Sequence, residues 1–142
     1  MNKKYFKSST GQFELYYPNH WTPIDEGEGT YLFLDKNDWK GNLRITALRR
    51  KSIESVKNDL NEELKRPNSK LIKLVDKDAV FWFKEFLEQD GSKLIMYNWA
   101  ISDKETLLAC SFVTDKNKLE QEQVKKELEF VIDTLKTIKA IQ

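Results

Sequence analysis

The stretch Ala79–Thr114, AVFWFKEFLEQDGSKLIMYNWAISDKETLLACSFVT, decides the fold. Its aromatic and β-branched side chains suit a pleated strand better than a helix. Asp90-Gly91 favours the left-handed backbone angles of a two-residue hairpin turn, and Ser102–Glu105 supplies a second polar turn. The sequence therefore predicts an antiparallel meander of three strands: Ala79–Glu88, Lys93–Ile101 and Thr106–Thr114.

A turn centred on Asp90 and Gly91 fixes the register of the first two strands by counting. It predicts four cross-strand pairs: Trp82 with Trp99, Lys84 with Tyr97, Phe86 with Ile95, and Glu88 with Lys93. A second turn, centred on Asp103-Lys104, places three more residues on the tryptophan face: Leu108, Cys110 and Phe112. The opposite face then contains Phe81, Phe83, Glu85, Leu87, Leu94, Met96, Asn98, Ala100, Leu107, Ala109, Ser111 and Val113. Both faces are mostly apolar, so a helix is expected on each.

Patterns before and after the meander predict the remaining elements. Alternating apolar residues predict strands at Phe13–Tyr17, Thr30–Leu34, Asn42–Arg49 and Lys70–Val75. Two amphipathic stretches predict helices, one from the N-cap Ser52 to about Arg66 and one from the capping pair Asn117 and Glu120 to about Lys139. The expected order is β-β-β-α-β-β-β-β-α. It makes an α+β fold in which an antiparallel β-sheet carries helices on both faces, an α/β/α sandwich.

The two faces of the meander differ in the size of their side chains. The small residues Ala100, Ala109 and Ser111 allow a helix to approach closely, which favours the long C-terminal helix on their face. The shorter helix, with the expected buried stripe Ile53, Val56, Leu60 and Leu64, would then cover the tryptophan face only in part. We therefore expect a groove beside the tryptophans.

Composition limits the classes of function. At 142 residues, the chain is expected to form a single domain over residues 1–142. Its 24 basic and 23 acidic side chains are spread along the sequence, without the clustered positive face of a nucleic-acid-binding protein. No apolar run approaches the roughly 20 residues of a membrane span, and Met1–Thr10 does not read as a secretory signal. Cys110 is a lone cysteine, which rules out an internal disulfide. We therefore expect a cytoplasmic protein.

The segment Phe13–Trp21, FELYYPNHW, resembles the opening of the PsbP-like superfamily, in which a strand ends in Tyr-Pro and a tryptophan follows. That group includes the photosystem II extrinsic protein, a Ran-binding nuclear import factor and uncharacterised bacterial domains. The resemblance, which extends to the element order, implies an α/β/α sandwich in a bacterial branch. It also implies binding of other proteins, without a shared catalytic apparatus or cofactor.

The residues of the chain offer few alternatives to binding. His20 and Cys110 are the only histidine and the only cysteine, and a buried strand cysteine is usually inert, so a catalytic pair is the minor hypothesis. Two acidic segments, Asp25–Glu28 and Asp35–Asp38, contain oxygen ligands but do not match a calcium loop, so no metal or cofactor is predicted. The basic cluster Arg44, Arg49, Arg50 and Lys51 leaves an anion-binding role open.

The aromatic residues give the better indication of function, although most of them are expected to pack in the core. Trp21 and Trp39 fall in loops, where aromatic side chains often contact a partner, and each could instead fold back onto the sheet. Glu85 and Asn98 are polar residues among apolar neighbours. The candidate binding surface is Trp21, Trp39, Trp82, Glu85, Tyr97, Asn98 and Trp99.

We therefore predict a non-enzymatic module that binds another protein, such as an adaptor, an effector chaperone or an immunity-type protein. No nucleic acid and no membrane is expected as a partner. The alternative is a small-molecule-binding protein or enzyme with a pocket beside Glu85, Asn98 and Tyr97.

Overall fold

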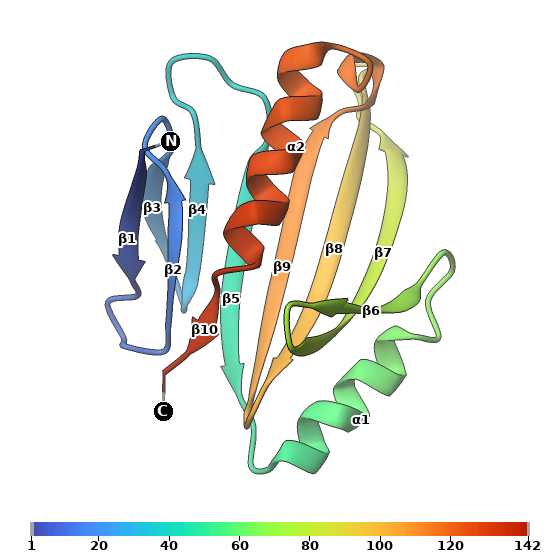
Figure 1. Ribbon diagram of the computed structural model, residues 1–142. Helices are drawn as coiled ribbons and strands as arrows, with labels where there is room; N and C mark the ends of the chain where they lie inside the picture. The colour runs from blue at the N-terminus through green and yellow to red at the C-terminus, as the bar shows by residue number, and fades with distance from the viewer. Residues whose placement is uncertain (1, 142) are drawn as a thin grey trace.

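Two antiparallel sheets form the frame of the computed structural model, which describes residues 2–141 (Figure 1). The three-stranded sheet has the order β1-β2-β10, and the seven-stranded sheet has the order β3-β4-β5-β9-β8-β7-β6. The strands are β1 (Lys3–Lys7), β2 (Phe13–Pro18), β3 (Thr22–Gly27), β4 (Thr30–Leu34), β5 (Asn42–Arg49), β6 (Lys70–Leu74), β7 (Lys77–Leu87), β8 (Lys93–Asp103), β9 (Thr106–Asp115) and β10 (Lys139–Ala140). The helices are α1 (Ile53–Glu63), α2 (Glu122–Leu135) and the short 3-10 helix η1 (Lys116–Lys118).

Helices lie on both faces of the large sheet, which confirms the predicted α/β/α arrangement. On one face, α2 and the small sheet bury a cluster that includes Phe13, Trp99 and Val131. On the other face, α1 buries a smaller cluster around Val56 and Val80. No helix formed by the described residues is long and apolar enough to cross a membrane.

The assignment of helices to faces was wrong. The long helix α2 packs over the bulky Trp99 face, where Val131 and Leu135 join Phe112 in the core. The shorter α1 takes the face of Ala100, and Leu60 lies in the same cluster. Small sheet residues do allow a close approach, but the wide aromatic face has more apolar area to bury and therefore takes α2 together with the small sheet.

The meander is present, but its first hairpin is shifted by one residue from the prediction. The backbone N–H of Gly91 donates to the carbonyl of Glu88 (3.0 Å), and the N–H of Glu88 donates to the carbonyl of Ser92 (2.9 Å). With Gly91 at φ 89°, this is a three-residue loop, in which a glycine in the left-handed region follows the turn. A two-residue turn at Asp90-Gly91 was predicted instead.

This shift moves every side chain of β7 to the other face of the sheet. Phe81 lies opposite Trp99, and Trp82 lies opposite Asn98. None of the four predicted pairs forms: the observed partners of Lys84, Phe86, Leu87 and Glu85 are Met96, Leu94, Lys93 and Ile95. Trp82 therefore does not share a face with Trp99, Tyr97 and Phe112.

Three short strands were not predicted. Most side chains of β1 and β3 are exposed or half-buried, so these strands form by backbone pairing with β2 and β4 and leave no alternating apolar pattern. The two residues of β10 pair with β2. The order β-β-β-α-β-β-β-β-α is therefore the observed order without β1, β3 and β10.

The helix boundaries were predicted in part. The side chain of Ser52 accepts from the N–H of Ser55, which confirms this residue as the N-cap of α1. Ile53 is 53% exposed, contrary to the expected stripe. α2 begins at Glu122 and not at Asn117, because the chain first makes the turn of η1.

Candidate functional site

Trp21 and Trp99, two of the seven candidate residues, belong to the core. They are 3% and 4% exposed, so neither offers a binding surface. Trp99 packs against Phe81 with ring centroids 5.5 Å apart. Tyr97 is half-buried beside them and stacks on Phe81 at 6.1 Å. Burial and the nearby Glu85 carboxylate raise the pKa of the Tyr97 hydroxyl.

Trp21 folds back from its loop onto α2. Its indole Nε1 donates to Oε2 of Glu127 (2.9 Å), and Nε2 of His20 lies 2.9 Å from the other carboxylate oxygen. Glu127 is only 2% exposed, so both of its oxygens are used inside the protein. The loop tryptophan of the PsbP-like segment thus has a structural role.

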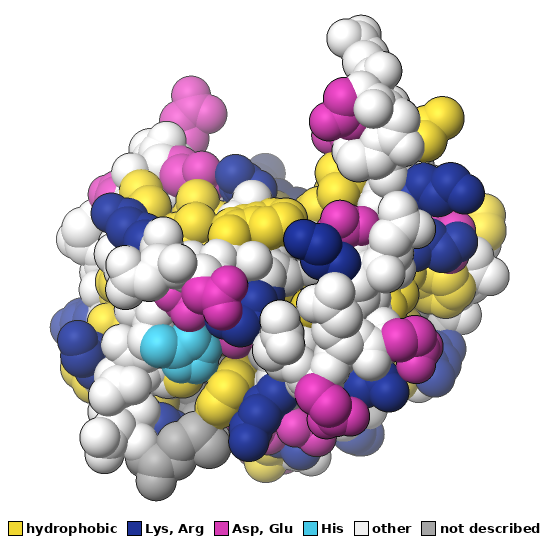
Figure 2. All heavy atoms as spheres, turned by 90° about the horizontal axis from the view of Figure 1, so that it is seen from above, with side chains coloured by type: hydrophobic (Ala, Val, Ile, Leu, Met, Phe, Trp, Pro, Cys, Tyr) yellow, Lys and Arg dark blue, Asp and Glu magenta, His cyan; other side chains and the backbone are white. Residues whose placement is uncertain are grey.

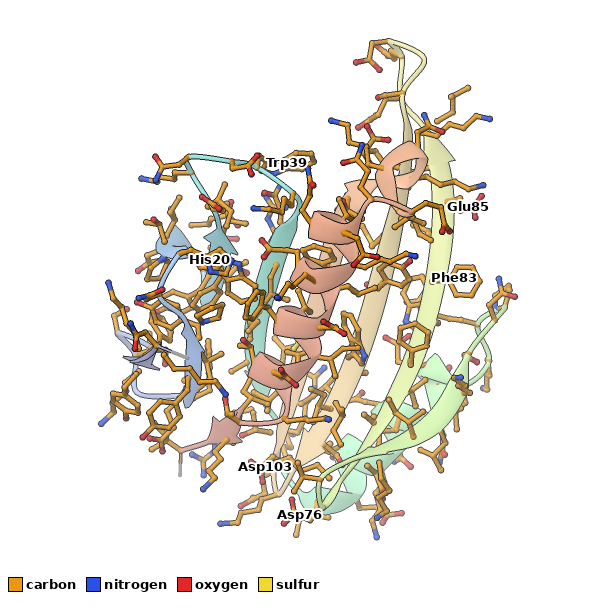
Figure 3. All side chains as sticks on the ribbon, turned by 45° about the horizontal axis from the view of Figure 1, so that its top comes forward. His20, Trp39, Asp76, Phe83, Glu85 and Asp103 are labelled. Atoms are coloured by element: carbon orange, nitrogen blue, oxygen red, sulfur yellow. The ribbon has the colours of Figure 1, made fainter. Side chains whose placement is uncertain are left out.

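Trp39 is the other loop tryptophan, and it remains 45% exposed. Its Nε1 donates to Oδ1 of Asn42 (2.8 Å), which fixes the ring at the start of β5. Figure 3 places Trp39 at the end of the molecule where the loop between β4 and β5 lies, and Glu85 on β7, on the other side of α2. These two candidates therefore do not form one surface.

The largest groove lies along the outer side of β7. It measures about 490 Å³ and is lined by Arg66, Pro67 and Asn68 from the loop after α1 and by Trp82–Glu85 of β7. The guanidinium of Arg66 lies 4.4 Å from the ring centroid of Trp82 and also bonds Glu63. Figure 3 shows Phe83 and Glu85 on this side of the molecule. The groove has one charged aromatic wall and one strand edge.

That strand edge has no neighbouring strand among the described residues. β6 pairs with β7 only from Lys77 to Phe81, whereas β7 continues to Leu87. Because the Glu88 N–H bonds β8, the alternation of an antiparallel ladder turns the N–H and C=O groups of Phe83, Glu85 and Leu87 outward. These six backbone groups face the groove side.

The upper end of this edge is partly charged. The Glu85 carboxylate accepts a hydrogen bond from Lys116 Nζ, and both side chains are well exposed. The expected conflict at Glu85 is therefore resolved by an ion pair near the end of the sheet. A shallow hollow of about 270 Å³ continues the groove past Phe86 and Leu87, and Leu87 is 67% exposed.

Asn98 lies on the other face of the sheet, away from Glu85 and Tyr97. Its side-chain Nδ2 is buried and has no hydrogen-bond partner among the described residues. It lines a hollow of about 260 Å³ together with Arg44, Thr46 and Ser111. A pocket shared by Glu85, Asn98 and Tyr97, as predicted, is not formed, because the one-residue shift of β7 puts Glu85 on the opposite face from Asn98.

No catalytic pair or metal site appears in the described part of the chain. Cys110 is buried, which raises the pKa of its thiol, while His20 is bonded to Glu127. No group of three or more metal-binding side chains occurs within residues 2–141. In the second acidic segment, Asp35 pairs with Lys40 at 3.1 Å, so a protein cation takes the place that a metal would need.

The basic cluster of the sequence is divided in the structure. Arg44 forms an ion pair with Glu26, and Arg50 forms one with Asp59. Arg44 lies in the middle of a sheet face, whereas Arg50 lies beside α1.

The whole of residues 1–142 matches one family model, whose description is "Domain of unknown function (DUF3805)". The chain belongs to this family. No curated protein is significantly similar to the chain.

Solved structures share the fold of this family member. A crystal structure from Bacteroides thetaiotaomicron VPI-5482 is 25% identical over 100% of the chain, with a TM-score of 0.85. The chain covers 50% of that protein, so it spans half of its length. LpqN of Mycobacterium tuberculosis, described as involved in cell envelope biogenesis, is 9% identical, with a TM-score of 0.62 and coverage of 99% and 91%.

The cyanobacterial PsbP (CyanoP) of Synechocystis sp. PCC 6803 is 11% identical, with coverage of 97% and 92% and a TM-score of 0.45. The resemblance to a PsbP-like fold in an uncharacterised bacterial family is confirmed.

Sequence reasoning missed two features of the candidate surfaces. It placed Pro67 and Asn68 only as a helix stop, although they form the wall of the groove. It also missed the free edge of β7, although the length difference between the predicted strands Lys70–Val75 and Ala79–Glu88 is the signal that could have found it.

Proposed function

We propose that this protein is a non-enzymatic protein-binding module that takes up an extended segment of a partner protein as an added strand beside β7. The observation that carries the proposal is the free outer edge of β7 between Trp82 and Leu87, next to the largest groove. An unpaired strand edge is a template for pairing with another chain, and strand addition is a common mode of peptide recognition.

The length of the edge suits a short peptide. At about 3.3 Å per residue, the segment Trp82–Leu87 extends for roughly 20 Å. The outward N–H and C=O groups of Phe83, Glu85 and Leu87 would pair with the peptide backbone, which gives affinity without sequence preference. Aromatic side chains on both sides of the edge would select the peptide side chains.

The side chains around the edge indicate the chemistry of the partner. Phe83 lies on the face of Tyr97, and Trp82 lies on the face of Phe86. All four side chains are half-buried and leave apolar area uncovered. The exposed Lys84 side chain sits between them. The preferred segment would therefore be extended, with apolar side chains on both faces and an acidic side chain beside Lys84.

Charged side chains at this edge also limit self-association. Lys84, Glu85 and Glu88 interrupt the apolar residues of β7, and charges on an edge strand oppose uncontrolled sheet extension. The edge thus remains available to a partner of matching sequence.

The test uses proline substitutions at outward-facing positions. Random peptides displayed on phage are selected on the immobilised protein, and affinities of the selected peptides are measured by fluorescence anisotropy. Glu85→Pro removes one outward N–H, which an edge strand tolerates, whereas Glu85→Ala keeps it. We expect peptide binding to weaken at least about tenfold in Glu85→Pro, since a main-chain hydrogen bond is lost and the ring blocks the ladder, and to change little in Glu85→Ala.

A second variant guards against misfolding. Leu87→Pro acts at the last residue of β7, where the fold depends least on the backbone, and it should weaken peptide binding as well. Selective slowing of amide exchange at residues 83, 85 and 87 in the complex would support strand addition. Equal peptide affinity in the folded Pro and Ala variants would refute it.

A further inference from the structure

A row of side chains crosses the sheet face that α1 covers only at one end. The strand registers align Trp82 with Asn98, Asn98 with Ser111, and Ser111 with Arg44. Residues opposite one another on neighbouring strands point to the same face. These four side chains therefore lie side by side across β7, β8, β9 and β5, beyond the residues that contact α1.

This part of the sheet is hollowed. Figure 2, which looks along the strands from above, shows a depression with hydrophobic side chains between two projecting parts of the surface. The hollow of about 260 Å³ is lined by Thr30, Arg44, Thr46, Asn98, Ala109 and Ser111, with Cys110 at its base. Its size is slightly below the range of drug-sized pockets, so a small ligand fits it best.

Asn98 is the unexplained residue in this hollow. Its Nδ2 is buried without a protein acceptor. A buried donor left unpaired costs about 1–3 kcal/mol, and a leucine in this position would avoid that cost. Because the two ends of a side-chain amide have the same shape, a half-turn about χ2 exchanges Nδ2 and Oδ1 without repacking. The amide can therefore turn its donor toward a ligand.

Other donors meet Asn98 in the same hollow. The carboxylate of Glu26 holds Nε and Nη2 of Arg44 at 2.8 and 3.2 Å, which fixes the guanidinium and leaves Nη1 as a donor. The hydroxyls of Thr30 and Thr46 bond each other at 2.8 Å, and one of these two retains a proton to donate. Ser111 adds a hydroxyl between Arg44 and Asn98.

We propose that this hollow binds a small carboxylate, held by Arg44, Ser111 and Asn98. Convergent donors next to a fixed guanidinium suit an acceptor-only group with two oxygens. Lys84, one pair further along β7 than Trp82, adds positive charge to the same face. Glu26 acts as a positioning residue for Arg44. This site is independent of the peptide edge, because Arg44 and Ser111 lie on strands away from the β7 edge.

The first test is a titration of the folded protein with glutarate, followed by NMR of the side-chain amide of Asn98 and the Nε–H of Arg44. Glutaramide serves as a neutral probe of the same length. We expect saturable shifts at both groups with glutarate and none with glutaramide. Equal shifts with the two compounds, or no saturable shift with glutarate or acetate, would overturn the carboxylate site.

The second test uses matched variants. Arg44→Gln should weaken glutarate binding at least tenfold, whereas Arg50→Gln should not, although both arginines are paired with a carboxylate and are similarly exposed, at 40% and 37%. Asn98→Leu should keep or raise the melting temperature and abolish binding. Retained binding in Asn98→Leu or Arg44→Gln would show that glutarate binds elsewhere and would contradict the proposal.

Discussion

The indole N–H of Trp21 donates to the carboxylate of Glu127 across 106 residues of sequence, at 2.9 Å. Both side chains are almost fully buried. His20 occupies the other oxygen of the same carboxylate. The loop after β2 is thereby attached to the middle of α2. This contact explains why a tryptophan follows the Tyr-Pro end of β2 without invoking a binding role.

Removal of the Glu127 carboxylate should destabilise the fold. Glu127→Ala leaves the Trp21 N–H buried without an acceptor and opens a cavity, so we expect a loss of about 2–4 kcal/mol in the free energy of unfolding. Urea denaturation measures this loss. Glu129→Ala, an exposed neighbour on the same helix, should change stability by less than about 0.5 kcal/mol. Similar losses in both variants would contradict this role.

Gly41 should not tolerate a side chain. Its φ is +153°, and an added Cβ would lie 2.3 Å from Cζ of Phe112 and 2.9 Å from the carbonyl oxygen of Val113. Phe112 is fully packed in the core. Gly41→Ala should therefore cost about 2–4 kcal/mol, by strain and overpacking. Gly11→Ala, at φ +70° with no heavy atom within 4 Å, should cost only about 1 kcal/mol in the same urea measurement.

Asp35 should contribute to stability in a pH-dependent manner. Burial alone would raise the pKa of its carboxyl, but hydrogen bonds from Lys40, Asn37 and Asp38 outweigh burial and lower the pKa below 3.8. The stabilisation is therefore present above this ordinary value and is lost as the pH falls through the lowered pKa.

The urea midpoint reports this dependence. Asp35→Asn should lower stability by about 1 kcal/mol near neutral pH and should match the unchanged protein in strongly acidic solution. Asp38→Asn, whose side chain is 72% exposed, should have little effect at any pH. An Asp35→Asn deficit that is constant with pH would show that the loss is steric.

Cys110 should react with thiol reagents only when the protein unfolds. Its side chain is buried in the core, and burial raises the pKa of the thiol, so little thiolate forms at neutral pH. Labelling by a disulfide reagent in native buffer should be at least about a thousandfold slower than in denaturing urea, because it requires a costly opening. Rapid labelling of the native protein would reopen the question of a catalytic cysteine.

Much of the fold follows from local sequence rules. Apolar alternation located the strands that pack in the core, and Ser52 marked the start of α1. The same rules did not detect β1, because its pairing with β2 involves mostly exposed side chains. Helix α2 begins late because the Asp115 side chain accepts from Asn117 and favours a tighter turn first.

The candidate site was harder to predict than the fold. Asp90-Gly91 is compatible with a two-residue and with a three-residue loop, and local sequence alone does not distinguish them. This single ambiguity exchanged the two faces of β7 and separated Trp82 from Trp99. The prediction that Asn98 is a polar residue among apolar neighbours does hold, because it required only the parity of β8. The wall formed by Pro67 depends on how a loop folds back in space, which periodicity does not describe.

The bond between Trp21 and Glu127 also limits when this fold can be completed in the cell. With 106 residues between the partners and ribosomes adding roughly 5–20 residues per second, the segment around Trp21 waits about 5–20 s for its acceptor to be synthesised. During that interval the aromatic residues of β2 and the following loop lack the cover of α2. The nascent chain therefore presents its most apolar N-terminal segment early, at the stage when chaperones that bind emerging chains would act on it.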